Sequence, residues 1–245
     1  MTHSAKHPGA TNQPTPPSSR RLLITAGPTH EPIDAVRYLG NRSSGRLGVA
    51  LADAAAGRGW QVTLLLGPTP LSPRNTRVSL RRFRSAADLE ALLSEEFPRC
   101  QTLVMAAAVA DYRPVQNQST AHTKIRRTGE ALTLELESTP DLLAACAAKR
   151  VPGQRLVGFA LEPRDRMLAS AQSKLERKSL DAIVANPLET MDAPQIEATL
   201  LFRAGTRSPV STPGAIPKED FADWLLDRLD ERTADAEGSS VNRPR

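Results

Sequence analysis

Short apolar runs alternate with helix-like segments along the chain, and this alternation limits the possible folds more than any other feature. Buried strands are expected at residues 21–26, 62–66, 76–83, 102–108, 131–136, 156–160, 182–185 and 197–202. Helices are expected from Ser43 or Ser44 to Gly57 and at residues 85–96, 139–149, 165–178 and 217–232. Strands that alternate with helices form largely parallel sheets with helices on both faces. The sequence therefore predicts an α/β, Rossmann-like fold.

The alternating pattern fills residues 21–232, which suits one large domain. Residues 1–20 are rich in proline and serine and hold no apolar segment, so a disordered tail is expected there and not a signal peptide. A second polar tail is expected at residues 233–245. Hydrophobic residues make up 40% of the chain, which is enough to bury a core without disulfide or metal staples.

Charge and composition exclude several classes of protein. The formal net charge is +5, but the basic residues lie in short groups and do not alternate with aromatic side chains. This favours a small anionic ligand over nucleic acid. No apolar run approaches the roughly 20 residues that a membrane-spanning helix needs. Cys100 and Cys146 form no C-x-x-C pair and the four histidines are scattered, which predicts a reduced, cytoplasmic chain without a zinc site.

Residues 43–48 read Ser-Ser-Gly-Arg-Leu-Gly at the expected start of a helix. Free amides at a helix start form a natural phosphate or carboxylate site, although a plain cap with a packed glycine explains the same residues. A nicotinamide cofactor needs its glycines directly after the first strand and an acid about 20 residues later. Here Gly45 follows Ala26 by 19 residues, and no acid follows the second strand at Leu66-Gly67. The cofactor hypothesis therefore fails.

Two polar residues stand where ligands of parallel sheets bind, beyond the carboxyl ends of the strands. Asn41 has a side-chain amide that can donate to a developing oxyanion without changing charge. Asp111 ends an apolar run of small residues and is able to accept from a ribose or base, or to help hold a metal ion. Each has a structural alternative, since asparagine favours loop turns and aspartate caps them.

Two basic groups complete the candidate site. Lys174, Arg177 and Lys178 share one helix face, where like charges repel unless an anion binds. Their alternative role is the favourable interaction of cations with a helix C-terminus. Residues 124–127 (Lys-Ile-Arg-Arg) lie in a polar loop and suit a lid over phosphates or, equally, a solvated loop.

Taken together and in order, these motifs resemble those of the phosphopantothenate–cysteine ligase family across residues 21–230. The matching segments are residues 24–29, 32–38, 41–48, 106–113, 124–127, 140–142, 158–160 and 174–186. The resemblance implies an enzyme that activates the carboxylate of 4′-phosphopantothenate with a nucleoside triphosphate, CTP in most bacterial members. An acyl-nucleotide forms, pyrophosphate leaves, and the amine of cysteine attacks with release of CMP or AMP.

The same resemblance assigns expected roles to residues of this chain. Asn41 and Lys124 would be catalytic. The nucleotide would be held by Met105, Ala106, Ala107, Asp111, Lys124, Pro140, Asp141, Leu142, Leu143, Phe159, Lys174 and Lys178. Phosphopantothenate would be held by Gly27, Ser43, Gly45, Gly48 and Asn186.

The resemblance also implies Mg²⁺ bound with the triphosphate and a homodimer in which one subunit contributes to its neighbour's site. Only about twenty residues precede the first strand, so neither flavin nor decarboxylation is expected. Three positions depart from the family pattern at the rim of the nucleotide pocket, namely Thr139, Leu161 and Pro163. They leave both CTP and ATP open as the nucleotide. They also keep a non-catalytic relative that binds nucleotides or phosphorylated ligands as the alternative.

Overall fold

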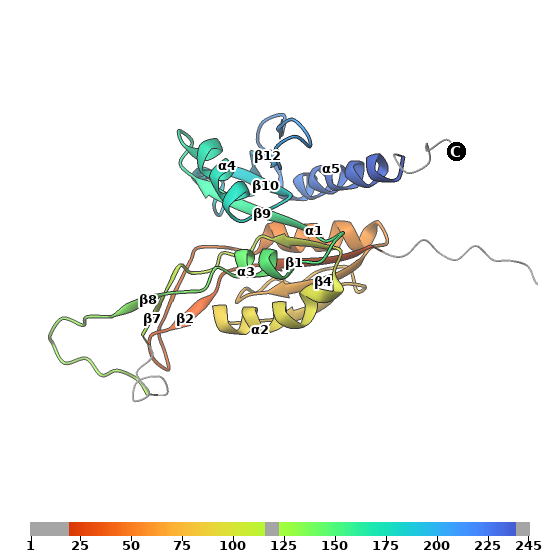
Figure 1. Ribbon diagram of the computed structural model, residues 1–245. Coiled ribbons are helices and arrows are strands. Elements are labelled where there is room, and N and C mark those ends of the chain that lie inside the picture. Colours follow the sequence, from red (N-terminus) through yellow and green to blue (C-terminus); the bar gives the residue numbers. More distant parts are fainter. Residues whose placement is uncertain (1–19, 116–122, 239–245) are drawn as a thin grey trace, which may run out of the picture.

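The computed structural model describes residues 20–115 and 123–238. Its centre is an eight-stranded sheet (Figure 1). The strands are β1 (Arg21–Ala26), β4 (Gln61–Leu66), β5 (Ser79–Arg82), β6 (Thr102–Met105), β9 (Arg155–Glu162), β10 (Ala182–Pro187), β12 (Thr199–Phe202) and β13 (Val210–Ser211). Their order is β13-β12-β10-β9-β6-β1-β4-β5, and the six strands from β10 to β5 are parallel. The predicted largely parallel sheet is confirmed.

Helices cover both faces of the sheet, as the alternating pattern predicted. Along β1 successive side chains point to opposite faces, so Leu22 and Ile24 join one core and Leu23 joins the other. The first core also takes side chains from α1 (Arg46–Gly57) and α5 (Lys218–Gly238). The second takes them from α2 (Ala86–Glu96), α3 (Leu142–Lys149) and α4 (Met167–Arg177). The short 3₁₀ turns η1 (Phe97–Arg99) and η2 (Leu188–Thr190) complete the helical elements of the described ranges.

Several predicted boundaries shift. The strand predicted at 76–83 is confined to Ser79–Arg82. The strand predicted at 102–108 ends at Met105, although backbone bonds to β1 and the residues just after it continue as far as Ala108. Helix α3 starts at Leu142 because Asp141 caps it, and α5 continues past residue 232 to Gly238. The strand predicted at 131–136 is wrong except for its last residue, because those side chains are exposed and pack on no core.

Two small antiparallel ribbons project from the sheet, and the sequence did not predict them. One pairs β2 (His30–Pro32) with β3 (Tyr38–Gly40), and the other pairs β7 (Tyr112–Pro114) with β8 (Leu136–Ser138). Figure 1 shows β2, β7 and β8 extending together away from the helices. We call residues 30–40, 112–115 and 123–138 the arm. A third ribbon, β11 (Gln195–Ile196) with β14 (Ile216–Pro217), lies near the start of α5.

Both cysteines are free and buried. Burial raises the pKa of Cys100 to about 12 and that of Cys146 to about 11, so both are protonated thiols at neutral pH. Within the described residues, no helix has the length and apolar character that crossing a membrane requires.

Candidate active site

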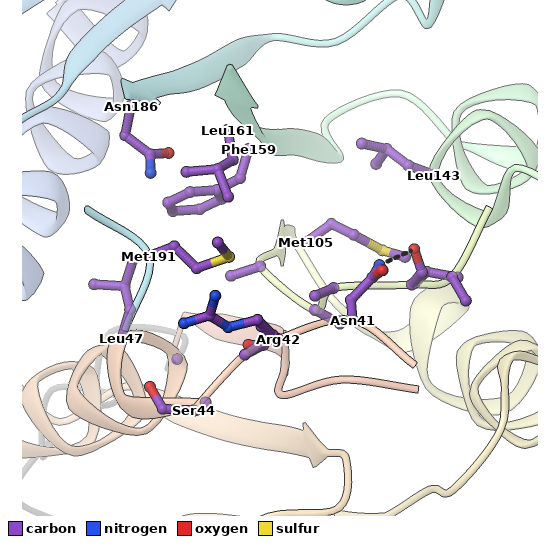
Figure 2. A pocket seen from close by; sticks show the side chains of 18 of the residues that line it. Asn41, Arg42, Ser44, Leu47, Met105, Leu143, Phe159, Leu161, Asn186 and Met191 are labelled. Atoms are coloured by element: carbon purple, nitrogen blue, oxygen red, sulfur yellow. Dashed lines mark hydrogen bonds between the residues drawn. The ribbon is translucent and has the colours of Figure 1, made fainter. Parts of the chain in front are cut away.

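A cavity of about 780 Å³ opens beyond the carboxyl ends of β6, β9 and β10 (Figure 2). Its other walls come from the start of α1, the segment after β6, the start of α3, one face of α4, residues 190–192 and the first residue of α5. Parallel α/β folds bind ligands at this edge of the sheet, where the carboxyl ends of the strands lie. Sixteen of the expected site residues line it: Asn41, Ser43, Gly45, Gly48, Met105, Ala106, Ala107, Asp111, Pro140, Asp141, Leu142, Leu143, Phe159, Lys174, Lys178 and Asn186.

Two glycines set the start of α1 against the sheet. Gly45 is the N-cap residue with φ +75°, and a Cβ on Gly48 would lie only 2.2 Å from the Cβ of Ala26. The expected hydroxyl cap is wrong, because α1 has no side-chain cap and Ser44 Oγ lies a long 3.5 Å from the amide nitrogen of Arg46. The first helical bond runs from the Val49 amide to Gly45 O. The amides of residues 46–48 therefore lack helical acceptors at the wall of the cavity.

Asn41 joins the loop before α1 to the segment after β6. Its Nδ2 donates to the carbonyl oxygen of Val109 at 2.9 Å, and Figure 2 shows this bond across one end of the cavity. A side-chain amide has two N–H donors and one acceptor oxygen, so this bond uses one of the donors. The structure thus fixes the amide while leaving donor capacity for a ligand.

Two fully buried threonines hold the small-residue wall of residues 106–110 in place. Thr25 Oγ1 accepts from the Ala107 amide at 3.2 Å, and Thr29 Oγ1 accepts from the Ala110 amide at 3.0 Å. On the other side, the Thr139 hydroxyl donates to the carbonyl oxygen of Ala110. These bonds anchor the backbone of the wall, and its small side chains leave room for a planar group to lie against it.

Two lysines, Lys174 of α4 and Lys178 at the C-cap of that helix, line the cavity with carboxylate partners. Lys174 Nζ lies 2.6 Å from Glu162 Oε1, and Lys178 Nζ lies 2.8 Å from Asp141 Oδ2. The bond from Lys174 holds the pKa of Glu162 below its usual range. Burial of Asp141 opposes its ionisation, but hydrogen bonds from Lys178 and Ala144 outweigh burial and lower its pKa. Both acids are therefore ionised at neutral pH and relieve the repulsion expected on this helix face.

The opposite end of the cavity is closed by residues 190–192. Asn186 Nδ2 donates to Thr190 Oγ1 at 2.7 Å, and that hydroxyl donates to the carbonyl oxygen of Pro187. Arg42 Nη2 lies 2.9 Å from Asp192 Oδ2, which links this segment to the loop before α1. In Figure 2 Met191 and Leu47 lie beside Arg42, and Asn41 lies on its other side.

Two of the expected site residues do not line this cavity. Gly27 lies behind the start of α1, where its Cα is 3.4 Å from the position of a Cβ on Gly45, so it supports the wall and does not face a ligand. Lys124 lies on the arm, exposed, beside Ile125 whose amide donates to Asp34 Oδ2 at 3.1 Å. Neither residue lines the cavity of a single chain, and their expected roles stay predictions.

Sequence reasoning also missed residues that line the cavity, namely Arg42, Arg46, Leu47, Met191, Asp192, Ile196 and Lys218. Arg42 and Arg46 stand inside the motif at residues 41–48, so their place in that motif was a usable signal. Lys218 was hidden because it reads as the first residue of an amphipathic helix. Among the described residues, no group of three or more His, Cys, Asp or Glu side chains is placed to hold a metal ion.

Fold and cavity together define an α/β protein with a cavity of ligand size at the carboxyl edge of its parallel sheet. Comparison with known proteins agrees: residues 18–232 match the family model described as the DNA/pantothenate metabolism flavoprotein C-terminal domain. The chain belongs to that family.

Individual relatives and solved structures show which part of a longer protein the chain resembles. The Coenzyme A biosynthesis bifunctional protein CoaBC of Vibrio cholerae is 39% identical over 204 residues, which are 80% of this chain and 50% of that protein. A protein named Cysteine/Cysteine sulfinic acid decarboxylase, from an unknown prokaryotic organism, is 45% identical over 174 residues, 71% of this chain and 47% of that protein. The chain spans about half the length of the curated relatives it matches.

A crystal structure of the C-terminal domain of CoaBC is 32% identical, covers 88% of this chain and 96% of its own, and superposes with a TM-score of 0.73. The half of the bifunctional protein that this chain matches is therefore the C-terminal domain.

Proposed function

We propose that this protein is a phosphopantothenate–cysteine ligase of coenzyme A biosynthesis. It would join 4′-phosphopantothenate to cysteine and consume a nucleoside triphosphate. Family membership and the likeness to the C-terminal domain of CoaBC support the proposal. The observation that carries it is one cavity of about 780 Å³, which places the first amides of α1, the amide of Asn41, Lys174 and Lys178 around one space. Its volume lies in the range of roughly 300–1,000 Å³ typical of ligand sites.

The proposed reaction has two balanced steps. A carboxylate oxygen of phosphopantothenate attacks the α-phosphorus of the triphosphate, the α–β phosphoanhydride bond breaks, and pyrophosphate leaves. The cysteine amine then attacks the acyl carbon, the acyl–phosphate bond breaks, and the nucleoside monophosphate leaves with the bond's electron pair. The amine loses one proton to solvent. Asn41 would donate to the acyl oxygen as negative charge develops on it. Lys174 and Lys178 would offset charge on the nucleotide.

We propose that Mg²⁺ accompanies the triphosphate. Magnesium ions usually bind through substrate phosphates and one or two carboxylates. Three aspartates line the cavity, and within the described chain Asp141 and Asp192 are in ion pairs whereas Asp111 is not. Asp111 is therefore the carboxylate that would complete the coordination of such an ion. The absence of flavin stays a prediction.

We propose that the protein acts as a homodimer through the arm. The arm exposes a row of large apolar side chains, namely Val36, Tyr38, Leu39, Tyr112, Val115, Leu132, Leu134 and Leu136. Exposed apolar surface of this kind usually marks a protein interface. Lys124 also stands on the arm, outside the cavity of its own chain. We therefore propose that the arm of one subunit brings Lys124 to the cavity of its partner.

Mixed dimers test this arrangement. Asn41→Asp and Lys124→Gln homodimers are each expected to be nearly inactive. Consider a dimer with one subunit of each variant. If Lys124 acts in the partner's cavity, one site carries both substitutions and the other site carries neither. Statistical mixing then recovers about a quarter of the wild-type rate. A mixture that stays inactive despite proven subunit exchange contradicts the shared site, because a lysine supplied within one chain leaves no intact site.

A pyrophosphate-release assay tests the proposed activity. Release should require phosphopantothenate, cysteine and a triphosphate together, and parallel reactions with CTP and ATP decide the nucleotide. The altered residue Leu161 lines the cavity and motivates the second candidate, a relative that binds these ligands without turnover. That candidate predicts thermal shifts with ligands but no pyrophosphate. We also propose a cytoplasmic location. Free cysteines suit a reducing compartment, and the proposed pathway is consistent with it.

A further inference from the structure

An ion pair between Arg42 and Asp192 stands at the wall of the cavity. Asp192 Oδ2 accepts from Arg42 Nε at 3.2 Å and from Arg42 Nη2 at 2.9 Å. Both side chains are open to solvent. Exposed ion pairs contribute little to stability, so these two groups can take up a ligand at little cost to the fold.

Each partner keeps hydrogen-bonding capacity on its free side. A guanidinium has five N–H donors, and within the described chain the Nη1 of Arg42 makes no hydrogen bond. The edge formed by Nη1 and Nη2 has the geometry that binds a carboxylate through two parallel bonds. Asp192 Oδ1 likewise accepts no hydrogen bond from the described residues. The pair therefore offers a donor edge and an acceptor oxygen side by side, which is the complement of an α-amino acid zwitterion.

The lysine pairs of the cavity do not offer this combination. Asp141, the partner of Lys178, also accepts from a main-chain amide and caps α3. Glu162, the partner of Lys174, does not itself line the cavity. A lysine is moreover a point charge and has no planar edge that matches a carboxylate. Both lysine pairs also lie at the end of the cavity that the proposed function gives to the nucleotide.

Other charged groups near Asp192 leave its carboxylate to Arg42. Burial lowers the pKa of Lys218 and Arg46 lowers it further, whereas Asp192 and Glu219 raise it. Lys218 is thus near Asp192, but within the described residues the two form no ion pair within 4.0 Å. The free oxygen of Asp192 therefore remains available to an ammonium group.

Arg42 also has the right position for the substrate that attacks. It follows Asn41 in the chain, and Figure 2 shows its guanidinium between Met191 and Asn41. Asn41 is the residue proposed to donate to the acyl oxygen, and a nucleophile must stand about 3–3.5 Å from the acyl carbon. The nitrogen of an α-amino acid is only two bonds from its carboxylate carbon. An amino acid whose carboxylate is held by Arg42 therefore has its amine within reach of an acyl group bound at Asn41.

We propose that Arg42 and Asp192 bind the amino acid substrate, with Arg42 holding its carboxylate and Asp192 holding its amine. This inference rests on the proposed function and deepens it, because it gives cysteine a place in the cavity. The bound ammonium group loses one proton to solvent before the attack. A remaining N–H then donates to Asp192 Oδ1, and the lone pair is free to attack the acyl carbon. The site would thus select an α-amino acid over an amine that lacks a carboxylate.

Cysteine and cysteamine together test this assignment, because cysteamine has the same amine and thiol but no carboxylate. Pyrophosphate release by the full chain is measured against the concentration of each amine. The wild-type kcat/KM should favour cysteine by about ten- to a hundredfold. Arg42→Gln should lower kcat/KM for cysteine by the same factor and leave that for cysteamine unchanged. A wild type without the preference, a variant that keeps it, or equal losses with both amines overturns the proposal.

Asp192→Asn should have a different signature, because both compounds carry the amine. It should lower kcat/KM several-fold for cysteine and cysteamine alike, and a loss confined to cysteine contradicts the role of Asp192. Arg164→Gln is the matched control, because Arg164 is an exposed arginine paired with Glu197 and does not line the cavity. It should use both amines as the wild type does.

The first step of the reaction separates this site from the rest of the cavity. Exchange of labelled pyrophosphate into the triphosphate should require phosphopantothenate but no cysteine. Arg42→Gln should exchange at the wild-type rate, and slower exchange would assign Arg42 to the acid or the nucleotide and overturn the proposal. If Arg42→Gln does not fold, Arg42→Lys decides, because it keeps the charge without the paired donors and should retain only part of the preference for cysteine.

Failure of the ligase function is distinguishable from failure of this inference. A wild type with neither exchange nor turnover refutes the ligase function. Thermal shifts with cysteine and cysteamine then test the site directly. A shift that is larger with cysteine and is lost in Arg42→Gln supports the amino acid site, and equal or absent shifts overturn it. Normal turnover with an unchanged preference in Arg42→Gln refutes the inference alone.

Discussion

The crevice and the arm are built by different means, although both are made of short strands and loops. In the crevice, fully buried threonines and close-packed glycines fix each wall from behind, as Thr25 and Gly48 show. On the arm, Tyr38 is 50% exposed and Tyr112 is 55% exposed, and the strands that carry them have three residues each. The walls of the cavity are fixed by contacts within one chain, whereas the arm exposes large apolar side chains.

Two carboxylates of the arm, Glu31 and Asp34, are buried exceptions, and Glu31 Oε1 accepts from the Ala86 amide at 2.9 Å at the start of α2. The carboxylate of Asp34 is 3% exposed and accepts from Arg37 and from the amides of Val36 and Ile125. It ties the loop that carries Lys124 to the ribbon of β2 and β3. Asp34 is thus a central tie of the arm, although backbone bonds such as that from the Ala35 amide to Thr123 O and the Arg113–Glu137 ion pair also hold it. Substitutions in the two regions should differ in kind as well as in size.

The largest effect is expected at Asn41. Asn41→Asp replaces a donor by an acceptor at a position where its Nδ2 now donates to Val109 O, so it removes a donor to the acyl oxygen and adds a like charge. The rate of pyrophosphate release should fall by about 10²–10³-fold, the loss seen when one oxyanion donor is removed. The melting temperature should change little, because the residue is exposed. A variant with near-normal turnover contradicts the assigned role.

Gly48→Ala should damage the crevice through packing. The added Cβ would lie 2.2 Å from the Cβ of Ala26, so α1 must move off β1. We expect a loss of about 1–3 kcal/mol in the free energy of unfolding, measured by urea denaturation, together with weaker ligand binding. Gly57→Ala in the same helix is the control, because a Cβ there meets no atom within 4 Å. It should stabilise the protein by about 0.5–1 kcal/mol.

The sheet and one edge of the cavity could be predicted from the sequence, whereas the arm and Lys218 could not. The alternation of buried strands and helices fixed the sheet, and the sheet rule placed residues 41–48 and 106–111 at one edge. The arm escaped prediction because β2 and β7 are too short to show a hydrophobic period. Lys218 escaped because its burial depends on β11 and β14, which bring the start of α5 to the cavity. A lysine opposing its own helix dipole was the one local signal.

Asp34 gives the arm a dependence on pH. Hydrogen bonds from the Arg37 side chain and from main-chain amides hold the pKa of Asp34 far below its usual value near 4. A carboxylate with a depressed pKa stabilises the fold fully above its unfolded pKa and loses this contribution as pH falls toward the folded pKa. Lowering the pH below about 4 should therefore loosen the arm before the sheet, with exchange of the Ile125 amide rising first.

Asp34→Asn should produce the same loosening at neutral pH. Exchange of the Val36 and Ile125 amides should accelerate by about tenfold while amides of β1 keep their protection. The pH dependence of arm exchange between about pH 2 and 5 should disappear in this variant. An equal loss of protection in β1 would show that the arm and the sheet open together, and would contradict an arm that opens by itself.

The smallest effect is expected where the crevice depends on a surface ion pair. Arg42 and Asp192 have side chains 75% and 41% exposed, so water screens their attraction. A double-mutant cycle of Arg42→Gln and Asp192→Asn should give a coupling of about 0.2–1 kcal/mol in unfolding free energy, falling as salt is added. Asp192 also has φ +57°, in the left-handed region that few residues other than glycine adopt. A coupling well above about 1 kcal/mol would mean that this wall of the cavity depends on one contact, because exposed ion pairs rarely contribute that much.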